Sequence, residues 1–246
     1  MYMIILKSKK MIKKIIAIFI ICLAVVLFLA VSKKLNIFFA KKYPLRGIDV
    51  SHYQSEIDWQ MLKKQEIEFV YIKATEGSSY VDKKFKKNWK GVQSAGITAG
   101  AYHFFSFDSS ALSQAKNFIK TVGNLSGKLV PMVDVEYYAD KENNSPDEKY
   151  VVAQLQEFLD ILEEKYGKKP IIYTTYKVYH KYIQKEFGQY PLWIRNVYYP
   201  PSDIDRKWQF WQYSDIGNIK GIKGDVDLNV FYGTMEEFEQ FIYSGK

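Results

Sequence analysis

The feature that most limits the possible folds is a regular alternation of short apolar runs with amphipathic stretches after residue 45. Helical spacing covers residues 82–95, 110–122, 145–167 and 234–242. The longest of these predicted helices would begin with Ser145 as N-cap and Pro146 at its first position, and would end at Gly167. The apolar runs have the length of buried strands and lie at 46–51, 69–75, 97–105, 129–136, 170–176, 191–196, 208–214 and 225–231.

Eight strands with helices between most of them predict an α/β fold with a parallel sheet. The runs are apolar throughout, which suits strands that are covered on both faces. The smallest (β/α)₈ barrels have about 200 residues, and residues 195–230 leave room for few helices. We therefore expect an irregular, TIM-like (β/α) barrel with about eight strands and reduced helices.

A second apolar segment precedes this region and has a different character. Residues 15–31 are 17 consecutive apolar residues with lysines on both sides, at the short edge of what spans a bilayer. Five lysines precede the segment and four follow it, which favours a cytoplasmic N-terminus by a small margin. We expect a basic N-terminus at 1–14, a transmembrane signal anchor at 15–32, a linker at 33–45 and a catalytic domain at 46–246, in the cell membrane with this domain outside. A cleaved signal and a secreted domain are the alternative.

The charge distribution argues against nucleic acid as a partner. The net charge is +8, but residues 1–46 hold ten basic residues and no acid, which leaves 25 basic and 27 acidic residues for 47–246. Cys22, the single cysteine, lies in the apolar segment, so the exported part has no disulfide and no cysteine nucleophile. His52, His103 and His180 do not have metal-binding spacing. We expect a monomer without metal or cofactor.

The stretch LVPMVDVEYY at 129–138 ends a predicted strand with two acids. Asp134 and Glu136 are two residues apart, so they share one face of the strand, with Cα atoms about 6–7 Å apart. Neighbouring carboxylates raise one another's pKa, which suits a general acid. A strand that has simply reached its solvated end would show the same pattern.

Further polar and aromatic residues gather at the ends of other predicted strands. Since the carboxyl ends of barrel strands surround the active site, we expect them to meet there. Several acids with an aromatic wall are typical of a sugar-binding site. The acids are Asp49, Glu76 and Asp227, and the partners are Tyr102, His103, Tyr173, Trp193, Trp211 and Gln212.

Seven motifs in order resemble the glycoside hydrolase family 25 lysozymes, the muramidases of the Chalaropsis type. They are GIDVSHYQSEIDW, FVYIKATEGSSYVDKKFKKNWKGVQSAGITAGAYHFF, PMVDVE, PIIYTTY, PLWIRN, WQFWQYS and DVDLNVF, and they cover residues 46–232. The resemblance implies an irregular (β/α) barrel, no metal, and hydrolysis of the β-1,4 bond between N-acetylmuramic acid and N-acetylglucosamine in peptidoglycan. It makes Glu136 the proton donor, with Asp134, Asp49 and Asp227 as further catalytic acids and Asn229 as part of the final motif.

The spacing of Asp134 and Glu136 falls between the carboxyl separations of about 5–5.5 Å for retention and about 6.5–9.5 Å for inversion. A substrate-assisted route, in which the N-acetyl group of the substrate attacks, fits the D-x-E pattern better. Two rival interpretations are a membrane-tethered module that binds peptidoglycan with little catalysis, and a chitinase-like enzyme. The anchor suggests local cell-wall remodelling or lysis.

Overall fold

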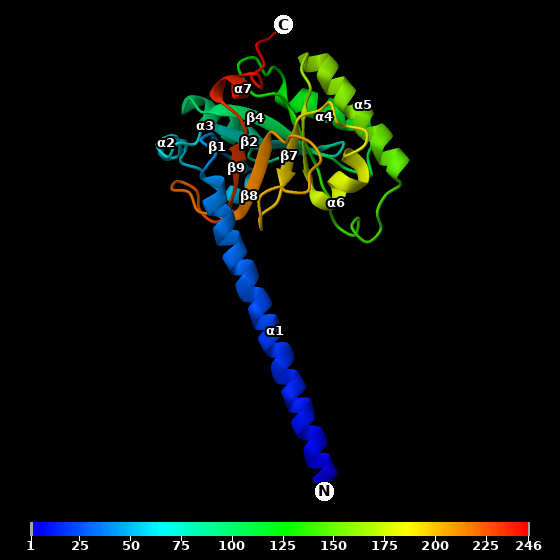
Figure 1. Cartoon of the computed structure of the whole chain (residues 1–246). Coiled ribbons are helices and arrows are strands. Elements are labelled where there is room, and N and C mark those ends of the chain that lie inside the picture. Colours follow the sequence, from blue (N-terminus) through cyan, green and yellow to red (C-terminus); the bar gives the residue numbers. More distant parts are fainter. Residues whose placement is uncertain (1, 246) are drawn as a thin grey trace.

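The computed structural model describes the backbone of residues 2–245, and the side chains of these residues except 2–10, 29–30 and 32–34. Eight strands close into a barrel, as predicted, because β1 pairs with both β2 and β9 (Figure 1). A ninth short strand, β3 (Tyr80–Val81), adds a hairpin to the edge of β2. The barrel strands are β1 (Arg46–Val50), β2 (Phe69–Glu76), β4 (Thr98–Phe104), β5 (Met132–Val135), β6 (Ile171–Thr175), β7 (Leu192–Arg195), β8 (Phe210–Gly217) and β9 (Val226–Phe231).

The last strand departs from the parallel arrangement expected from the sequence. Neighbouring strands from β1 to β8 around the barrel are parallel, whereas β9 is antiparallel to both β8 and β1. Only residues 218–225 separate β8 from β9. A parallel neighbour needs a crossover of about a dozen residues or more, so this short connection allows only the reversed direction.

The helices on the outside of the barrel lie where the spacing predicts them, with one correction at a terminus. Helix α5 is capped by Asp147, whose side chain accepts a hydrogen bond from the Tyr150 amide, and not by Ser145. The Ser145 hydroxyl instead donates to Tyr137. Gly167 ends the helix in a left-handed conformation, as expected. The helices are α2 (Trp59–Lys63), α3 (Phe85–Ser94), α4 (Ala111–Val122), α5 (Glu148–Tyr166), α6 (Tyr176–Val178) and α7 (Met235–Glu239), with a 3₁₀ turn at His52–Gln54 and a π-helical turn at Tyr179–Ile183.

The barrel interior is filled mainly by aromatic side chains. Trp193 stacks on Phe210 at 4.9 Å between ring centroids and packs edge-on against Tyr71 at 5.2 Å. Phe238 of α7 closes the amino end of the barrel by packing against Phe69. This packed interior restricts open space to the other end of the barrel, where the strands finish.

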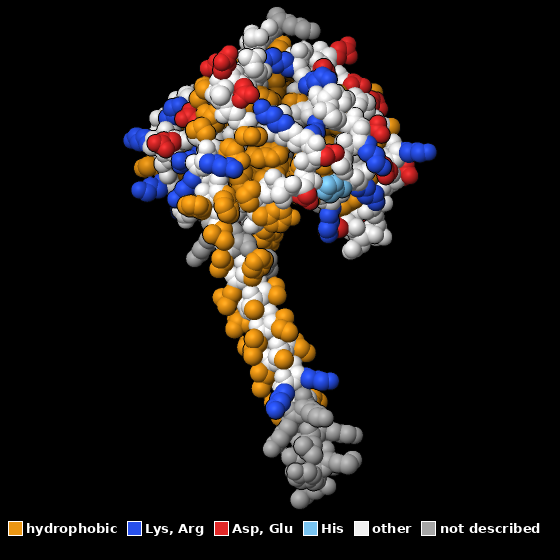
Figure 2. Space-filling model, viewed as in Figure 1, with side chains coloured by type: hydrophobic (Ala, Val, Ile, Leu, Met, Phe, Trp, Pro, Cys, Tyr) orange, Lys and Arg blue, Asp and Glu red, His pale blue; other side chains and the backbone are white. Residues whose placement is uncertain are grey.

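The N-terminal helix α1 (Tyr2–Ala40) extends away from the domain and is unbroken from its first residue to the barrel (Figure 1). Its segment Met11–Phe28 has a mean hydropathy of 2.7 and no buried residue, so it is long and apolar enough to cross a membrane, a property shared by signal sequences. Apolar side chains cover this part of the helix in the space-filling view (Figure 2). The segment 33–45, expected as a linker, is helical as far as Ala40.

The end of α1 packs against the barrel. Asn36 is fully buried, and its side-chain amide donates to the carbonyl oxygens of Tyr213 at 2.7 Å and Asn196 at 3.0 Å. Tyr43 contacts the rings of Trp208 and Trp211 edge-on. These contacts make the last turns of α1 part of the folded domain.

Candidate active site

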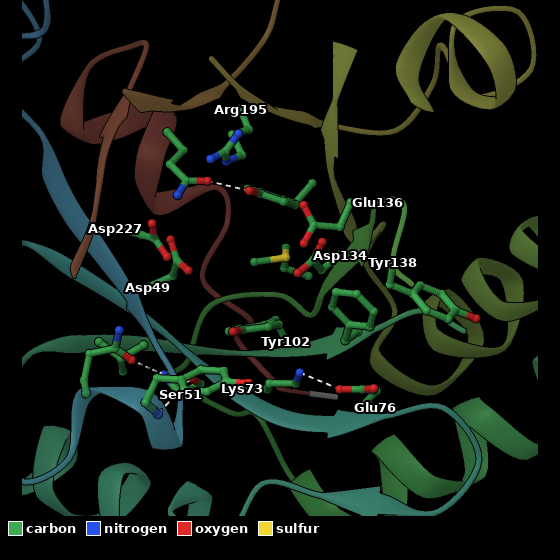
Figure 3. A pocket seen from close by; sticks show the side chains of 17 residues that line it. Asp49, Ser51, Lys73, Glu76, Tyr102, Asp134, Glu136, Tyr138, Arg195 and Asp227 are labelled. Carbon is green, nitrogen blue, oxygen red and sulfur yellow. Dashed lines mark hydrogen bonds and ion pairs between the residues drawn. The ribbon is translucent and has the colours of Figure 1, made fainter. Parts of the chain in front are cut away.

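A pocket of about 450 Å³ opens at the carboxyl ends of the parallel strands, where a (β/α) barrel carries its active site (Figure 3). It contains five carboxyl groups, two basic residues and several aromatic rings, and Asp49 and Asp227 face Asp134 and Glu136 across it. The lining residues are Asp49, Val50, Ser51, Tyr53, Gln54, Lys73, Glu76, Tyr102, Phe104, Met132, Asp134, Glu136, Tyr138, Tyr173, Arg195, Gln212 and Asp227.

Strand β5 supplies the two acids on one wall. Asp134 and Glu136 both line the pocket, whereas Val133 and Val135 point into the core outside the barrel, as the alternation along a strand requires. Burial, and then the charge of Glu136, raise the pKa of Asp134 well above its usual range. Burial also raises the pKa of Glu136, although the Arg195 charge opposes this effect. Both groups therefore retain protons to higher pH than free carboxyls do.

The inner oxygen of Asp134 is unusual for a buried polar atom. Oδ1 of Asp134 is inaccessible to solvent and has no hydrogen-bond partner among the residues that the structure describes. Buried polar atoms are nearly always paired, because an unpaired one costs about 1–3 kcal/mol. An oxygen enclosed without a partner disfavours the charged carboxylate, in agreement with the raised pKa of Asp134.

The opposite wall carries Asp49 and Asp227, which face each other across the β1–β9 pair. Burial raises the pKa of Asp227 to about 6. Burial, and then the nearby Asp227 charge, raise the pKa of Asp49 well above its usual range. The Asn229 side-chain amide donates to Asp49 at 2.8 Å and orients it. Because the two carboxyl groups interact directly, they titrate as a pair and not as independent groups.

A bulge in β2 brings two charged residues into the pocket. Lys73 and Glu76 are three residues apart, so a regular strand would place them on opposite faces. The register of β2 against β4 shifts between Lys73 and Thr75, and both side chains consequently face the pocket, where they form a 2.7 Å ion pair. Glu76 was expected at the site, and Lys73 was not. A single lysine within the apolar run FVYIKAT is the signal that could have identified it.

Arg195 is the second basic residue that the sequence analysis missed. It ends β7, lines the pocket and forms a 2.9 Å ion pair with Asp215. Trp193, two residues earlier on the same face, was expected to contact sugar but lies one layer deeper. There it is fully buried among aromatic rings, and its indole nitrogen donates to Asn229. A charged residue at the end of the apolar run PLWIRN was the available signal for Arg195.

Three other residues expected to contact substrate do not line the pocket. His103 and Trp211 follow and precede the inward-facing Tyr102 and Gln212, so alternation points them outward. His103 is buried between Thr75 and Gln114, and burial lowers its pKa to about 4. Trp211 donates to the Asn196 carbonyl. Asn229 points inward but is fully buried behind Asp49, which it supports.

The aromatic residues of the pocket include two expected ones, Tyr102 and Tyr173. The hydroxyl of Tyr173 is hydrogen-bonded to Gln212, which also faces the pocket as expected. Tyr138 and Tyr53 were not expected, because they lie in loop and turn segments where strand alternation gives no orientation. Rings beside carboxyl groups with raised pKa values are suited to bind a sugar and to transfer a proton to its glycosidic oxygen. Within residues 2–245, no group of three or more His, Cys, Asp or Glu side chains is arranged to hold a metal ion.

Comparison with known proteins assigns a family to this barrel. The family model described as glycosyl hydrolases family 25 matches residues 48–222, which include Asp49, Asp134 and Glu136. The uncharacterized protein YegX of Escherichia coli is 40% identical over 206 residues, which cover 81% of this chain and 74% of that protein. Lysozyme M1 of Streptomyces globisporus is 34% identical over 207 residues, which cover 77% of this chain and 68% of that protein.

A solved structure shares the fold at similar identity. The family 25 glycosyl hydrolase of Bacillus anthracis superposes with a TM-score of 0.78 and 45% sequence identity, covering 82% of this chain and 94% of that one. The family model matches more than half of the chain, and the similar proteins agree with that match. The chain belongs to glycosyl hydrolase family 25, and it is a glycoside hydrolase with the barrel of that family.

Proposed function

We propose that the protein is a lysozyme-type N-acetylmuramidase that hydrolyses the β-1,4 bond between N-acetylmuramic acid and N-acetylglucosamine in peptidoglycan. The observation that carries the proposal is a set of four carboxyl groups with raised pKa values that line one pocket at the strand ends of a family 25 barrel. They are Asp49, Asp134, Glu136 and Asp227. The similarity to Lysozyme M1 supports peptidoglycan as the substrate.

Glu136 is the proposed proton donor to the leaving oxygen. It is partly exposed to the pocket, whereas Asp134 behind it is 9% exposed. Burial raises the pKa of Glu136, so this carboxyl group keeps its proton closer to neutral pH than an ordinary glutamate does. Arg195 limits this rise, and so allows the same group to act as a base in the second half of the reaction.

Asp134 is proposed to bind the N-acetyl amide of the substrate. The part of its carboxyl group that lines the pocket can accept a hydrogen bond from the amide N–H, and this bond stabilises the carboxylate form. The amide oxygen would then attack the anomeric carbon as the glycosidic bond breaks and Glu136 gives its proton to the departing oxygen. Water subsequently opens the resulting oxazolinium ring and loses a proton to Glu136.

Asp49 and Asp227 are proposed to stabilise the positive charge that develops on the sugar ring. They face the β5 acids across the pocket, and their shared proton leaves one negative charge on the pair (Figure 3). A fixed negative charge in a partly buried site lowers the energy of an oxocarbenium-like transition state. This substrate-assisted route retains configuration. Proton NMR should therefore show the β-anomer as the first product, and an α-anomer as first product would contradict it.

We also propose that α1 remains attached as a signal anchor, with its N-terminus in the cytoplasm and the hydrolase domain outside the cell membrane. The apolar segment Met11–Phe28 and the slight excess of lysines before it support this topology. The proposed role is local remodelling of the adjacent wall. The mass of the mature protein tests the anchor: an intact mass supports it, and a chain that begins near Ser32 would show a cleaved signal.

The main test uses the detergent-solubilised full chain on purified peptidoglycan, beside the variants Glu136→Gln and Glu157→Gln. Glu157 is exposed on α5, away from the pocket, and serves as the matched control. Fragments are reduced with borohydride and analysed by mass spectrometry. New reducing ends on muramic acid, lost only in Glu136→Gln, are expected. Reducing ends on glucosamine would indicate a glucosaminidase, and binding without cleavage would indicate a tethered binding module.

A further inference from the structure

The contacts of α1 define its direction along the barrel. Tyr43, just past the helix, contacts Trp208, which precedes β8, and Trp211 at the start of that strand. Asn36, farther toward the N-terminus, contacts Tyr213 within β8 and Asn196, the residue that follows β7. Moving along α1 toward its N-terminus therefore follows β8 toward its carboxyl end. The helix leaves the barrel on the side where the strands finish.

The pocket opens on that same side. Arg195, which ends β7 and lines the pocket, is the chain neighbour of Asn196, to which α1 is bound. In Figure 1 the free part of α1 extends from the side that carries α6, whereas α7 and the C-terminus lie at the opposite end of the barrel. If α1 crosses the membrane, the pocket mouth consequently faces the bilayer rather than the distant wall.

The connection between the membrane segment and the domain is short and rigid. Helix α1 has no glycine or proline between Phe28 and Ala40, and its buried Asn36 is bonded to two backbone carbonyls of the barrel. The run of consecutive apolar residues ends at Val31, five residues before Asn36. A helix rises about 1.5 Å per residue, so this stretch spans roughly 8 Å. The headgroup layer is about 5–8 Å thick on each side. The rim of the mouth beside α1 therefore lies at the membrane surface.

The side chains near the contact between α1 and the domain are of the kind found at membrane interfaces. Leu35, Tyr199 and Ile216 are each close to half exposed, and they lie on α1, after β7 and near the end of β8. Apolar side chains continue from the helix onto the adjoining face of the domain (Figure 2). Aromatic and aliphatic residues at this depth are stabilised by the headgroup region.

We propose that the protein cuts glycan strands that lie against its own bilayer, the class of strand that is still carried by a membrane lipid. A pocket that faces the membrane at this distance admits a chain that runs along the bilayer surface, and directs the four acids away from the outer wall layers. The inference rests on the proposed muramidase activity and the uncleaved anchor. It adds that the substrate lies against the bilayer and is therefore still attached to a membrane lipid.

The orientation can be tested separately from activity. The full chain carrying Cys22→Ser and a fluorophore on Tyr199→Cys is placed in vesicles with a nitroxide quencher on the lipid headgroups. Gln189→Cys, in the exposed turn before β7 at the opposite end of the barrel, is the matched control. Quenching at residue 199 should be several times stronger than at residue 189. Equal quenching, or stronger quenching at residue 189, would overturn the proposed orientation.

The substrate is tested with the full chain in vesicles that carry lipid-linked glycan on the outer leaflet, beside the same glycan released from its lipid. A flexible Gly/Ser segment inserted between Lys34 and Leu35 keeps the anchor and the docked end of α1 but removes the fixed orientation. The same segment inserted after Met1, across the membrane, is the control.

The parent and the control should cleave lipid-linked glycan roughly tenfold faster than released glycan. The insertion after Lys34 should lose most of this ratio while cleaving released glycan at the parent rate. An unchanged ratio would refute the inference while leaving the muramidase proposal intact. Failure of every variant to cleave either glycan would refute the muramidase proposal itself.

Discussion

Replacement of Asn36 by alanine should destabilise the whole hydrolase domain, although residue 36 lies in the helix that carries the membrane segment. The change removes two hydrogen bonds from a fully buried side chain. The Asn196 carbonyl keeps a 2.8 Å bond from Trp211, so the main loss is the 2.7 Å bond to Tyr213. A stranded buried carbonyl costs about 1–3 kcal/mol, and the lost packing adds about 1 kcal/mol. Oδ1 of Asn36 is buried without a hydrogen-bond partner among the described residues, so its removal offsets part of this loss. The expected total is about 1–2 kcal/mol.

In a domain of this size, 1 kcal/mol corresponds to about 2–4 °C in Tm, so Asn36→Ala should melt about 2–8 °C below the parent. The assay is thermal unfolding of the detergent-solubilised full chain, followed by tryptophan fluorescence. Asn143→Ala, at an exposed loop position, is the control and should change Tm little. A Tm within about 1 °C of the parent for Asn36→Ala would mean that α1 is a loose tether, and would refute the reasoning about its docking.

Three further outcomes follow from the pocket. Glu136→Gln should lower kcat by about 10²–10⁴-fold with little change in Tm, measured by release of reducing ends; wild-type turnover would exclude Glu136 as the acid. Asp227→Asn should stabilise the fold above pH 6 by up to about 3 kcal/mol. Burial raises the pKa of Asp227 from 3.8 to about 6, so the parent protein loses stability as the pH rises through this range, and asparagine does not ionise. This gain should vanish near pH 4, and an equal gain at pH 4 and 7.5 would contradict it. Arg195→Met should move the alkaline limb of kcat/KM to higher pH, because Arg195 lowers the pKa of Glu136; an unmoved limb would argue against that coupling.

The strand positions were predictable because apolar runs in a barrel are covered on both faces and stand out in the sequence. The shared face of Asp134 and Glu136 followed from alternation alone, since β5 is regular. The direction of β9 was not predicted, because its pattern indicates which residues face inward and is the same for either direction. The length of the β8–β9 connection contained the information, since 218–225 is too short for a crossover.

The candidate site was harder to predict where a strand is irregular, or where residues on one face of a strand lie at different depths in the barrel. Strict alternation places Lys73 and Glu76 on opposite faces, and only the bulge in β2 brings them together. Trp193 and Arg195 share one face, but depth along the barrel separates a core residue from a pocket residue, and depth has no local sequence signal. The docking of Asn36 is likewise a contact across 160 residues or more, which no local pattern reports.

The pairing of β1 with β9 has a consequence for when the enzyme becomes active. Asp49 lies on the first strand of the barrel and Asp227 on the last, and they meet only when these strands pair in register. A slip of one residue would turn Asp227 to the outside. During export β9 is the last barrel strand to emerge, so we expect the hydrolase to remain inactive until β9 has been translocated. A chain that stops at Asp225 should accordingly show no hydrolysis. The wall beside the export site would then be protected from a partly translocated enzyme.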